Sequence, residues 1–198
     1  MQNLGKLFVF EGPDGVGKST LAQWFATHLE NAGNRCTLLS FPGKEVGTLG
    51  RHVYELHHDP GKFGIDTLSE ASLQLLHVAA HIDAIETRIK PLLGSGSIIV
   101  LDRFWWSTFV YGIVGGVSRS VLDGMIAVKR SAWHPVRPDR LFVISRSAPL
   151  RRGPPDLWPR WRDAYSDLAE QEIDVHPVVI VPNEQDVSAA QKRILENV

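Results

Sequence analysis

The sequence predicts an α/β fold in which helices cover both faces of a parallel sheet of about five strands. Two observations support this prediction. Short segments made wholly of apolar residues recur along the chain, and longer segments with helical spacing of apolar residues lie between them. Strands that are apolar on both faces are buried on both faces, which is typical of parallel sheets. The chain has 198 residues, so we expect residues 1–198 to form a single domain.

The expected elements alternate from the start of the chain. The expected strands are Leu7–Phe10, Thr37–Phe41, Ile98–Leu101, Leu141–Ile144 and Val178–Val181. The expected helices are Ser19–Asn31, a long one from about Thr67 to Leu93, and Val187–Val198. Turn residues close these segments, namely Gly33, Pro42-Gly43 and Gly94-Ser95-Gly96. Parallel strands joined by right-handed crossovers place ligands at their carboxyl ends, so functional residues are expected in the loops that follow the strands.

The composition limits the possible partners. Apolar residues make up 43% and charged residues 22% of the chain, as in an ordinary globular protein. The net charge of −1 predicts no nucleic-acid partner and no attraction to an anionic membrane. The single cysteine, Cys36, allows no internal disulfide and indicates a reducing compartment. Because we see neither a secretory signal nor an apolar run near the roughly 20 residues of a membrane span, we expect a cytoplasmic protein.

The loop after the first expected strand carries the strongest motif. The segment Gly12–Ser19 reads GPDGVGKS and satisfies G-x-x-x-x-G-K-[ST], between a strand and a helix. Its glycines let successive backbone N–H groups point at one phosphate group, and the helix adds its positive N-terminal end. Lys18 is expected to reach the β- and γ-phosphates of ATP, and the Ser19 hydroxyl to bind Mg²⁺. The expected nucleotide-binding residues are Gly12, Asp14, Gly15, Val16, Gly17, Lys18, Ser19 and Thr20.

The loop after the third expected strand distinguishes between classes of phosphate-binding protein. We find no guanine-reading Asn-Lys-x-Asp after a later strand, which argues against a GTPase. Instead the strand ends in Leu101-Asp102-Arg103-Phe104. Asp102 is placed to join Ser19 near the metal, and Arg103 to hold a second anion, which suits an acceptor that is already phosphorylated. The alternative is an Asp-Arg pair that only closes the strand end.

Several segments together resemble the thymidylate kinase family, over about residues 6–145. They are Phe10–Thr20, Phe41-Pro42-Gly43, Leu49-Gly50-Arg51 to Asp59-Pro60, Ile89–Leu92, Leu101–Phe104, Ser107–Gly112 and Arg137–Leu141. The resemblance implies the P-loop NTPase fold and phosphoryl transfer from Mg·ATP to a nucleoside monophosphate. The acceptor it implies is dTMP or a related or unusual pyrimidine nucleotide. Members of the family commonly dimerise through their helices, so the resemblance also implies a possible homodimer.

The resemblance also implies roles for matching positions around the acceptor. Asp14 would lie near the sugar and Mg²⁺, and Arg103 would hold the acceptor phosphate. Ser107 would face the base and Tyr111 would lie beneath the sugar. Phe41 and Pro42 would line the acceptor site, with Lys44 where some members place an arginine.

Catalytic arginines are implied in a lid. The phosphate loop carries Gly15 where some family members have an arginine. Members without that loop arginine take the catalytic arginine from the lid, which is expected here at about residues 145–162, with Arg151 and Arg152 as candidates. A solvated basic loop is the alternative. The expected catalytic residues are therefore Lys18, Arg103, Asp14, Arg151 and Arg152.

The long helix departs from the family pattern. His77 and His81 stand where the family presents an aromatic residue and, four residues later, an arginine, with Gln74 beside them. The spacing of four places both histidines on one helix face. They could read an acceptor base, serve as structural helix residues, or bind a metal, although the Glu of H-E-x-x-H is missing.

Four tryptophans complete the expectations. Trp158 and Trp161 are predicted to pack one helix face into the core, and one of Trp105 and Trp106 to face the acceptor cavity.

Two rival functions remain open. A kinase acting on a nucleoside or other small-molecule hydroxyl would need a carboxylate base, for which Asp14 and Glu11 are candidates. The other rival is a nucleotide-binding homologue without turnover.

Overall fold

The computed structural model describes residues 5–151, 156–184 and 186–198. Its centre is a parallel sheet of five strands in the order β2-β3-β1-β4-β5. The strands are β1 (Leu7–Glu11), β2 (Cys36–Ser40), β3 (Ile98–Asp102), β4 (Arg140–Ser145) and β5 (Val178–Pro182). Every neighbouring pair runs parallel. The predicted sheet is confirmed, with each strand within about one residue of its expected bounds.

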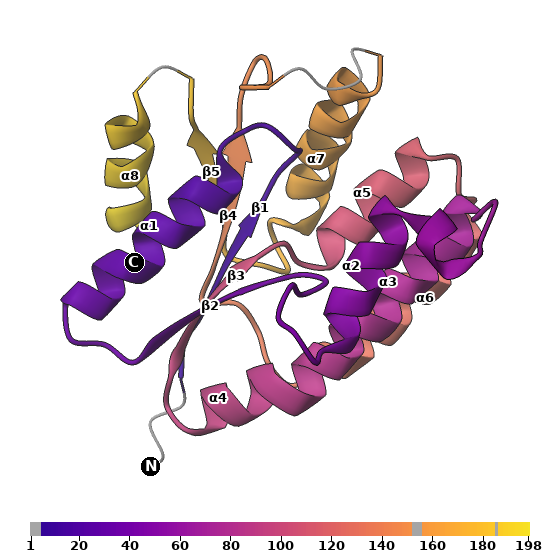
Figure 1. The fold of residues 1–198 in the computed structure, drawn as a ribbon. Coiled ribbons are helices and arrows are strands. Elements are labelled where there is room, and N and C mark those ends of the chain that lie inside the picture. The colour runs from indigo at the N-terminus through magenta and orange to yellow at the C-terminus, as the bar shows by residue number, and fades with distance from the viewer. Residues whose placement is uncertain (1–4, 152–155, 185) are drawn as a thin grey trace.

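Helices fill the connections between the strands (Figure 1). They are α1 (Lys18–Asn31), α2 (Leu49–His58), α3 (Glu70–Ala84), α4 (Lys90–Gly94), α5 (Trp105–Val114), α6 (Arg119–Trp133), α7 (Trp158–Glu172) and α8 (Val187–Leu195). A 3-10 turn (η1, Pro60–Phe63) follows α2, and a π-helical turn (η2, Ile85–Ile89) joins α3 to α4. The long helix expected from Thr67 starts at Glu70, because Ser69 accepts a hydrogen bond from the Ser72 N–H and so caps it. Each helix among the described residues is too short or too polar to cross a membrane.

The sheet is buried on both faces. Alternate residues of β1 enter two different cores: Leu7 and Val9 join one, and Phe8 and Phe10 join the other. Figure 1 shows α1 and α8 on one side of the sheet and the layer from α3 to α6 on the other. The continuous apolar run of β1 is explained by this two-sided burial.

The strand order decides which loops meet. Strands β1 and β3 are neighbours, and Phe10 pairs with Asp102. The loop after β1 and the loop after β3 therefore leave the same edge of the sheet side by side. Both expected anion-binding segments follow these two strands, so the fold brings them together.

Candidate active site

The phosphate loop, Gly12–Gly17, connects β1 to α1 and is braced from the far edge of the sheet. Gly17 has a φ of 88°, a conformation that residues with a side chain rarely adopt. A Cβ on Gly17 would lie 2.5 Å from Nδ2 of Asn183. That same Nδ2 donates to the Val16 carbonyl at 2.7 Å. The glycine therefore provides both the turn and the space for Asn183, which fixes the loop.

The segment after β4 rests on the phosphate loop. The Leu150 N–H donates to the Gly15 carbonyl at 2.8 Å. From α7, the Trp158 Nε1–H donates to the Asp14 carbonyl at 2.7 Å. Arg151 is exposed and directly follows the first of these contacts. Arg152, the other lid arginine expected from the sequence, lies outside the described residues.

Lys18, Ser19 and Asp102 form a polar cluster where the phosphate loop meets the end of β3. The Ser19 hydroxyl donates to Oδ2 of Asp102 at 2.5 Å, and Lys18 Nζ lies 3.6 Å from Oδ1 of the same residue. Burial and the nearby charge of Arg103 hold the pKa of Lys18 below its ordinary value, despite the opposing carboxylates. Asp102 Oδ1 is buried and has no hydrogen-bond partner among the described residues. A hydroxyl oxygen beside a carboxylate oxygen that has no hydrogen-bond partner forms a pair of oxygen ligands that suits Mg²⁺.

Arg103 turns into the cleft beside this cluster. It has a φ of 78°, an uncommon conformation for a residue with a side chain, and residues in such conformations cluster at functional sites. Its guanidinium bonds to the Asp14 carboxylate, donates to the Ser107 hydroxyl at 3.2 Å and lies 5.3 Å from the centre of the Tyr111 ring. Burial alone would raise the pKa of Asp14, but the charges of Arg103 and Lys18 outweigh it and keep that pKa below its ordinary value.

Glu11 holds the Arg103 loop in place from below. This carboxylate is fully buried. Its Oε1 accepts from the backbone N–H groups of Phe104 at 2.6 Å and Ser107 at 3.0 Å. Its Oε2 accepts from the Ser107 hydroxyl at 2.8 Å and the Tyr165 hydroxyl at 2.9 Å. Glu11 thus caps the N-terminus of α5 from a distant strand, and it does not line the cavity described next.

A large cavity of about 600 Å³ opens between these groups and the helices α2, α3, α5 and α7. All the acceptor-site residues expected from the sequence line it, namely Phe41, Pro42, Lys44, His77, His81, Arg103, Ser107 and Tyr111. Asp14, Ser19 and Asp102 line the end nearest the phosphate loop. The volume falls in the range typical of small-molecule sites, and a nucleotide is of suitable size. Ser107 differs from expectation in one respect, because its hydroxyl is already engaged by Glu11, Arg103 and Tyr165.

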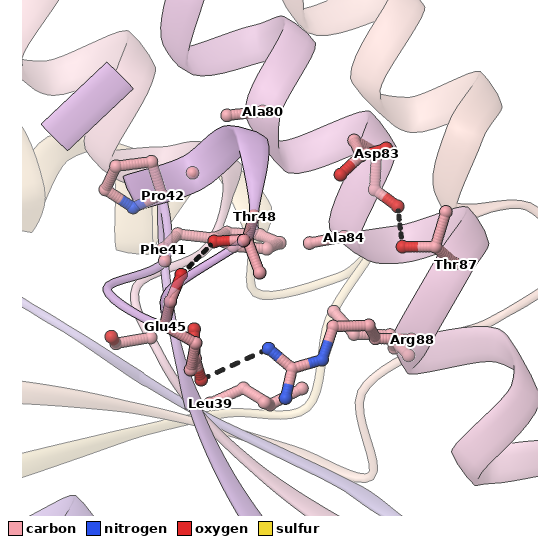
Figure 2. A pocket seen from close by; sticks show the side chains of 15 residues that line it. Leu39, Phe41, Pro42, Glu45, Thr48, Ala80, Asp83, Ala84, Thr87 and Arg88 are labelled. Atoms are coloured by element: carbon pink, nitrogen blue, oxygen red, sulfur yellow. Dashed lines mark hydrogen bonds and ion pairs between the residues drawn. The ribbon is translucent and has the colours of Figure 1, made fainter. Parts of the chain in front are cut away.

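A smaller cavity of about 270 Å³ shares Phe41 and Pro42 with the lining of the large one (Figure 2). Across it, Glu45 forms an ion pair with Arg88 at 3.2 Å. The Thr48 hydroxyl donates to the Glu45 carbonyl at 2.7 Å. The ion pair ties the loop after β2 to the π-helical turn.

The histidine wall of the large cavity comes from α2 and α3. The His81 ring stacks on Phe41 with centroids 4.0 Å apart, and His77 Nε2 lies 3.0 Å from His57 Nδ1. Burial, with smaller contributions from the neighbouring His57, Lys129 and Arg103, lowers the pKa of His77 to about 3, so its ring is neutral. Within the described part of the chain, no group of three or more His, Cys, Asp or Glu side chains is arranged to hold a metal, which gives no support to the metal hypothesis for this pair.

The prediction for Trp105 and Trp106 needs correction. Trp105 and Trp106 are both buried in the core and neither lines the large cavity, because α5 begins at Trp105 and presents Ser107, Thr108 and Tyr111 to the cavity instead. Trp158 is buried as expected. Trp161 packs against the core as expected, and it also lines the cavity and packs on Tyr111 with ring centroids 4.9 Å apart.

Some residues at the cavity were not anticipated from the sequence. Those in its lining include Tyr54, His57, Glu70, Thr108 and Trp161. Behind it lies Lys129 of α6, which contacts His81 and Thr108. The signal that could have revealed Lys129 is its position on the apolar stripe of α6.

A backbone phosphate loop and an arginine from the neighbouring strand face one cavity of nucleotide size. Together with the parallel sheet, this arrangement defines the class as a P-loop kinase of the nucleoside monophosphate type.

Comparisons with known proteins identify the family. The family model described as thymidylate kinase matches residues 10–152. The chain is 32% identical to a thymidylate kinase of Rhodopseudomonas palustris, over 96% of this chain and 90% of the relative. It is 29% identical to one of Ruegeria pomeroyi, over 99% of this chain and 95% of the relative. The chain belongs to the thymidylate kinase family. A crystal structure of thymidylate kinase from Ehrlichia chaffeensis matches with a TM-score of 0.78 at 23% identity, covering 97% of both chains, and this likeness concerns the fold alone.

Proposed function

We propose that the protein transfers the γ-phosphate of Mg·ATP to the phosphate of a pyrimidine deoxynucleoside monophosphate, with dTMP as the first candidate. The observation that carries the proposal is the orientation of Arg103. Its guanidinium lines the large cavity beside the phosphate loop, next to Asp14, where it can pair with the acceptor phosphate. Family membership and the names of the relatives support the same acceptor.

The proposed mechanism depends on positioning and charge. The phosphate loop and Lys18 hold the donor phosphates, and Arg103 holds the acceptor phosphate facing them. Arg151 and Arg152 belong to the proposed lid, about residues 145–162, which would add positive charge over the transferred group. An acceptor that is already a phosphate needs no general base. Tyr111, packed between Arg103 and Trp161, is proposed to lie beneath the sugar, where its ring disfavours a 2′-hydroxyl.

Mg²⁺ fits the polar cluster at the end of β3. Ser19 and Asp102 are the residues proposed to hold it, because Oδ1 of Asp102 is buried without a hydrogen-bond partner in the described residues. When bound, Mg²⁺ supplies charge neutralisation on the β- and γ-phosphates.

Replacing Asp102 with asparagine is expected to raise the Mg²⁺ concentration for half-maximal activity by about tenfold. The amide retains the shape of the side chain but removes the negative charge that attracts the cation. The measurement is a Mg²⁺ titration of the phosphoryl-transfer rate at saturating nucleotides. Asp123→Asn is the matched control, because Asp123 pairs with Arg119 on the exposed surface of α6. A half-maximal concentration equal to that of the unmodified protein would exclude Asp102 from the metal site.

The rival hydroxyl kinase is less well supported by the site. It needs a carboxylate base at the acceptor, but Glu11 is buried outside the cavity lining and already accepts five hydrogen bonds. Asp14 lines the cavity but is paired with Arg103. Both carboxylates are therefore engaged elsewhere.

An ADP-release assay over a panel of acceptors tests the proposal. The panel contains dTMP, dUMP, dCMP, UMP and the unphosphorylated nucleosides thymidine and deoxyuridine. We expect turnover of the deoxynucleoside monophosphates, with dTMP or dUMP preferred, and none of the nucleosides. Activity confined to nucleosides would establish the hydroxyl kinase, and tight binding of Mg·ATP with no turnover of any acceptor would favour the non-catalytic homologue.

A cytoplasmic location is proposed because the donor, the metal and the acceptor nucleotides are all available there.

A homodimer is proposed from the family resemblance and from exposed apolar side chains on α3 and α6, which include Leu75, Val121 and Val128. Light scattering of the purified protein would measure the oligomeric state.

A further inference from the structure

A buried lysine stands directly behind the histidine wall of the large cavity. Lys129 of α6 is completely buried. Its Nζ donates to the Thr108 hydroxyl at 2.9 Å, contacts Nδ1 of His81 and lies 5.8 Å from the centre of the Phe41 ring. No carboxylate of the described residues lies within ion-pair distance of it. A lysine buried this deeply without a carboxylate partner is unusual, because burial of an ammonium group is unfavourable unless its hydrogen bonds are satisfied.

The contact between Lys129 and His81 determines where the imidazole proton lies. An ordinary lysine is a stronger base than an ordinary histidine by about 4 pKa units. Burial lowers the pKa of both groups, and the charge of Lys129 adds to the effect on His81. By the ordinary order of basicity, a proton shared by the pair stays on the lysine. An ammonium group has no lone pair, so Nδ1 of His81 must be the acceptor and Nε2 must carry the ring proton.

The contacts of the His81 ring leave its Nε2–H facing the large cavity. One face of the ring is covered by Phe41, with the two rings inclined by only 12°. Nδ1 is engaged by Lys129. His81 and Thr108 both line the large cavity. Lys129, which is fully buried, supports both of them from the side away from the cavity.

We propose that Lys129 is a positioning residue that fixes the Nε2–H form of His81, so that His81 donates a hydrogen bond to the acceptor base. Such a donor selects a base that presents a carbonyl oxygen to His81. At the ring position where thymine and uracil carry a carbonyl group, cytosine carries an amino group. That amino group is itself a donor and cannot accept a hydrogen bond from the His81 N–H. The substrate preference rests on the proposed function, whereas the protonation state of His81 does not. Removing Lys129 frees the imidazole to exchange its proton between the two nitrogens, so it could then also accept a hydrogen bond from cytosine.

The tautomer can be measured without any assay of activity. The protein labelled with ¹⁵N-histidine is examined by NMR spectroscopy, and the signals of His81 among the eight histidines are assigned by their loss in His81→Gln. We expect Nε2 to be protonated and Nδ1 to be unprotonated. A proton on Nδ1, or an equal mixture of the two neutral forms, in the unmodified protein would overturn the proposal. In Lys129→Met we expect a mixture.

The selectivity is measured by steady-state kinetics with dTMP and dCMP. In Lys129→Met the ratio of kcat/KM for dTMP to that for dCMP is expected to fall by about tenfold. The change should appear mainly as a lower KM for dCMP, with kcat nearly unchanged, because the freed imidazole can accept a hydrogen bond from cytosine and does not contact the transferred phosphate. Lys192→Met, at an exposed lysine of α8, is the control and should leave the ratio unchanged.

The outcomes separate the two proposals. A folded Lys129→Met protein with the unmodified ratio would overturn the role of Lys129. Should that variant fail to fold, the spectrum of the unmodified protein still decides the tautomer on which the role depends. A protein with the Nε2–H tautomer but no activity on any nucleotide would contradict the proposed function and support only the locking of His81 by Lys129.

Discussion

Arg103→Met is expected to lower kcat/KM for the acceptor nucleotide by on the order of a thousandfold, with little change in the affinity for Mg·ATP. Methionine retains much of the apolar stem but removes the charge and the paired N–H donors that hold a phosphate. It is also a better replacement than glycine, because a methionine keeps a Cβ at the positive φ of 78° and so leaves the backbone strain of this position unchanged. The measurements are initial rates over a range of dTMP concentrations and calorimetric titration with Mg·ATP.

The control for this prediction is Arg119→Met. Arg119 is an exposed arginine of α6 that pairs with Asp123 at 2.8 Å, away from the large cavity. It should leave both the rate and the ATP affinity unchanged. An Arg103→Met protein that loses ATP affinity as much as acceptor use would place Arg103 at the donor and contradict its assignment.

Glu11→Gln is expected to lower the free energy of unfolding by about 3 kcal/mol. The carboxylate accepts four hydrogen bonds from Phe104, Ser107 and Tyr165 while fully buried. A glutamine would turn an NH₂ group toward some of these donors and remove the charge that strengthens the rest. For a chain of this size the expected fall in Tm is roughly 6–12 °C. Thermal unfolding followed by circular dichroism measures it.

Tyr165→Phe is the matched comparison for Glu11→Gln. It removes the Tyr165 hydroxyl donor alone and should cost about 1 kcal/mol. Equal stability of Glu11→Gln and the unmodified protein would show that the buried network does not hold the Arg103 loop in place.

The strands were predictable because their burial is two-sided. Leu7–Phe10 and Ile98–Leu101 are wholly apolar, and no helical period competes with a strand over so short a run. Helix α5 was not assigned from sequence for the converse reason. Most residues of Trp105–Val114 are buried, so the segment has no polar face to reveal a helical period.

The site was predictable where its residues are close in sequence. The phosphate loop and the Asp102-Arg103 pair are local motifs, and strand order alone brings them together. The residues that were missed reach the cavity through tertiary packing of helices. Lys129 shows the difference, because it occupies the same stripe of α6 as the buried Leu122, Met125, Ile126 and Trp133. A lysine on an apolar stripe signals an internal polar contact, but nothing in the sequence names His81 as its partner.

A nucleotide that spans both halves of the site tests the central claim, which is that the phosphate loop holds the donor and Arg103 holds the acceptor phosphate at one continuous site. The ligand is adenosine joined 5′ to 5′ to thymidine through a polyphosphate bridge, and its binding is measured by calorimetry beside ATP and dTMP alone. We predict that it binds about a hundredfold more tightly than either nucleotide, because the second contact becomes intramolecular. A linked nucleotide that binds no more tightly than ATP, or that does not compete with dTMP for binding, would contradict the account.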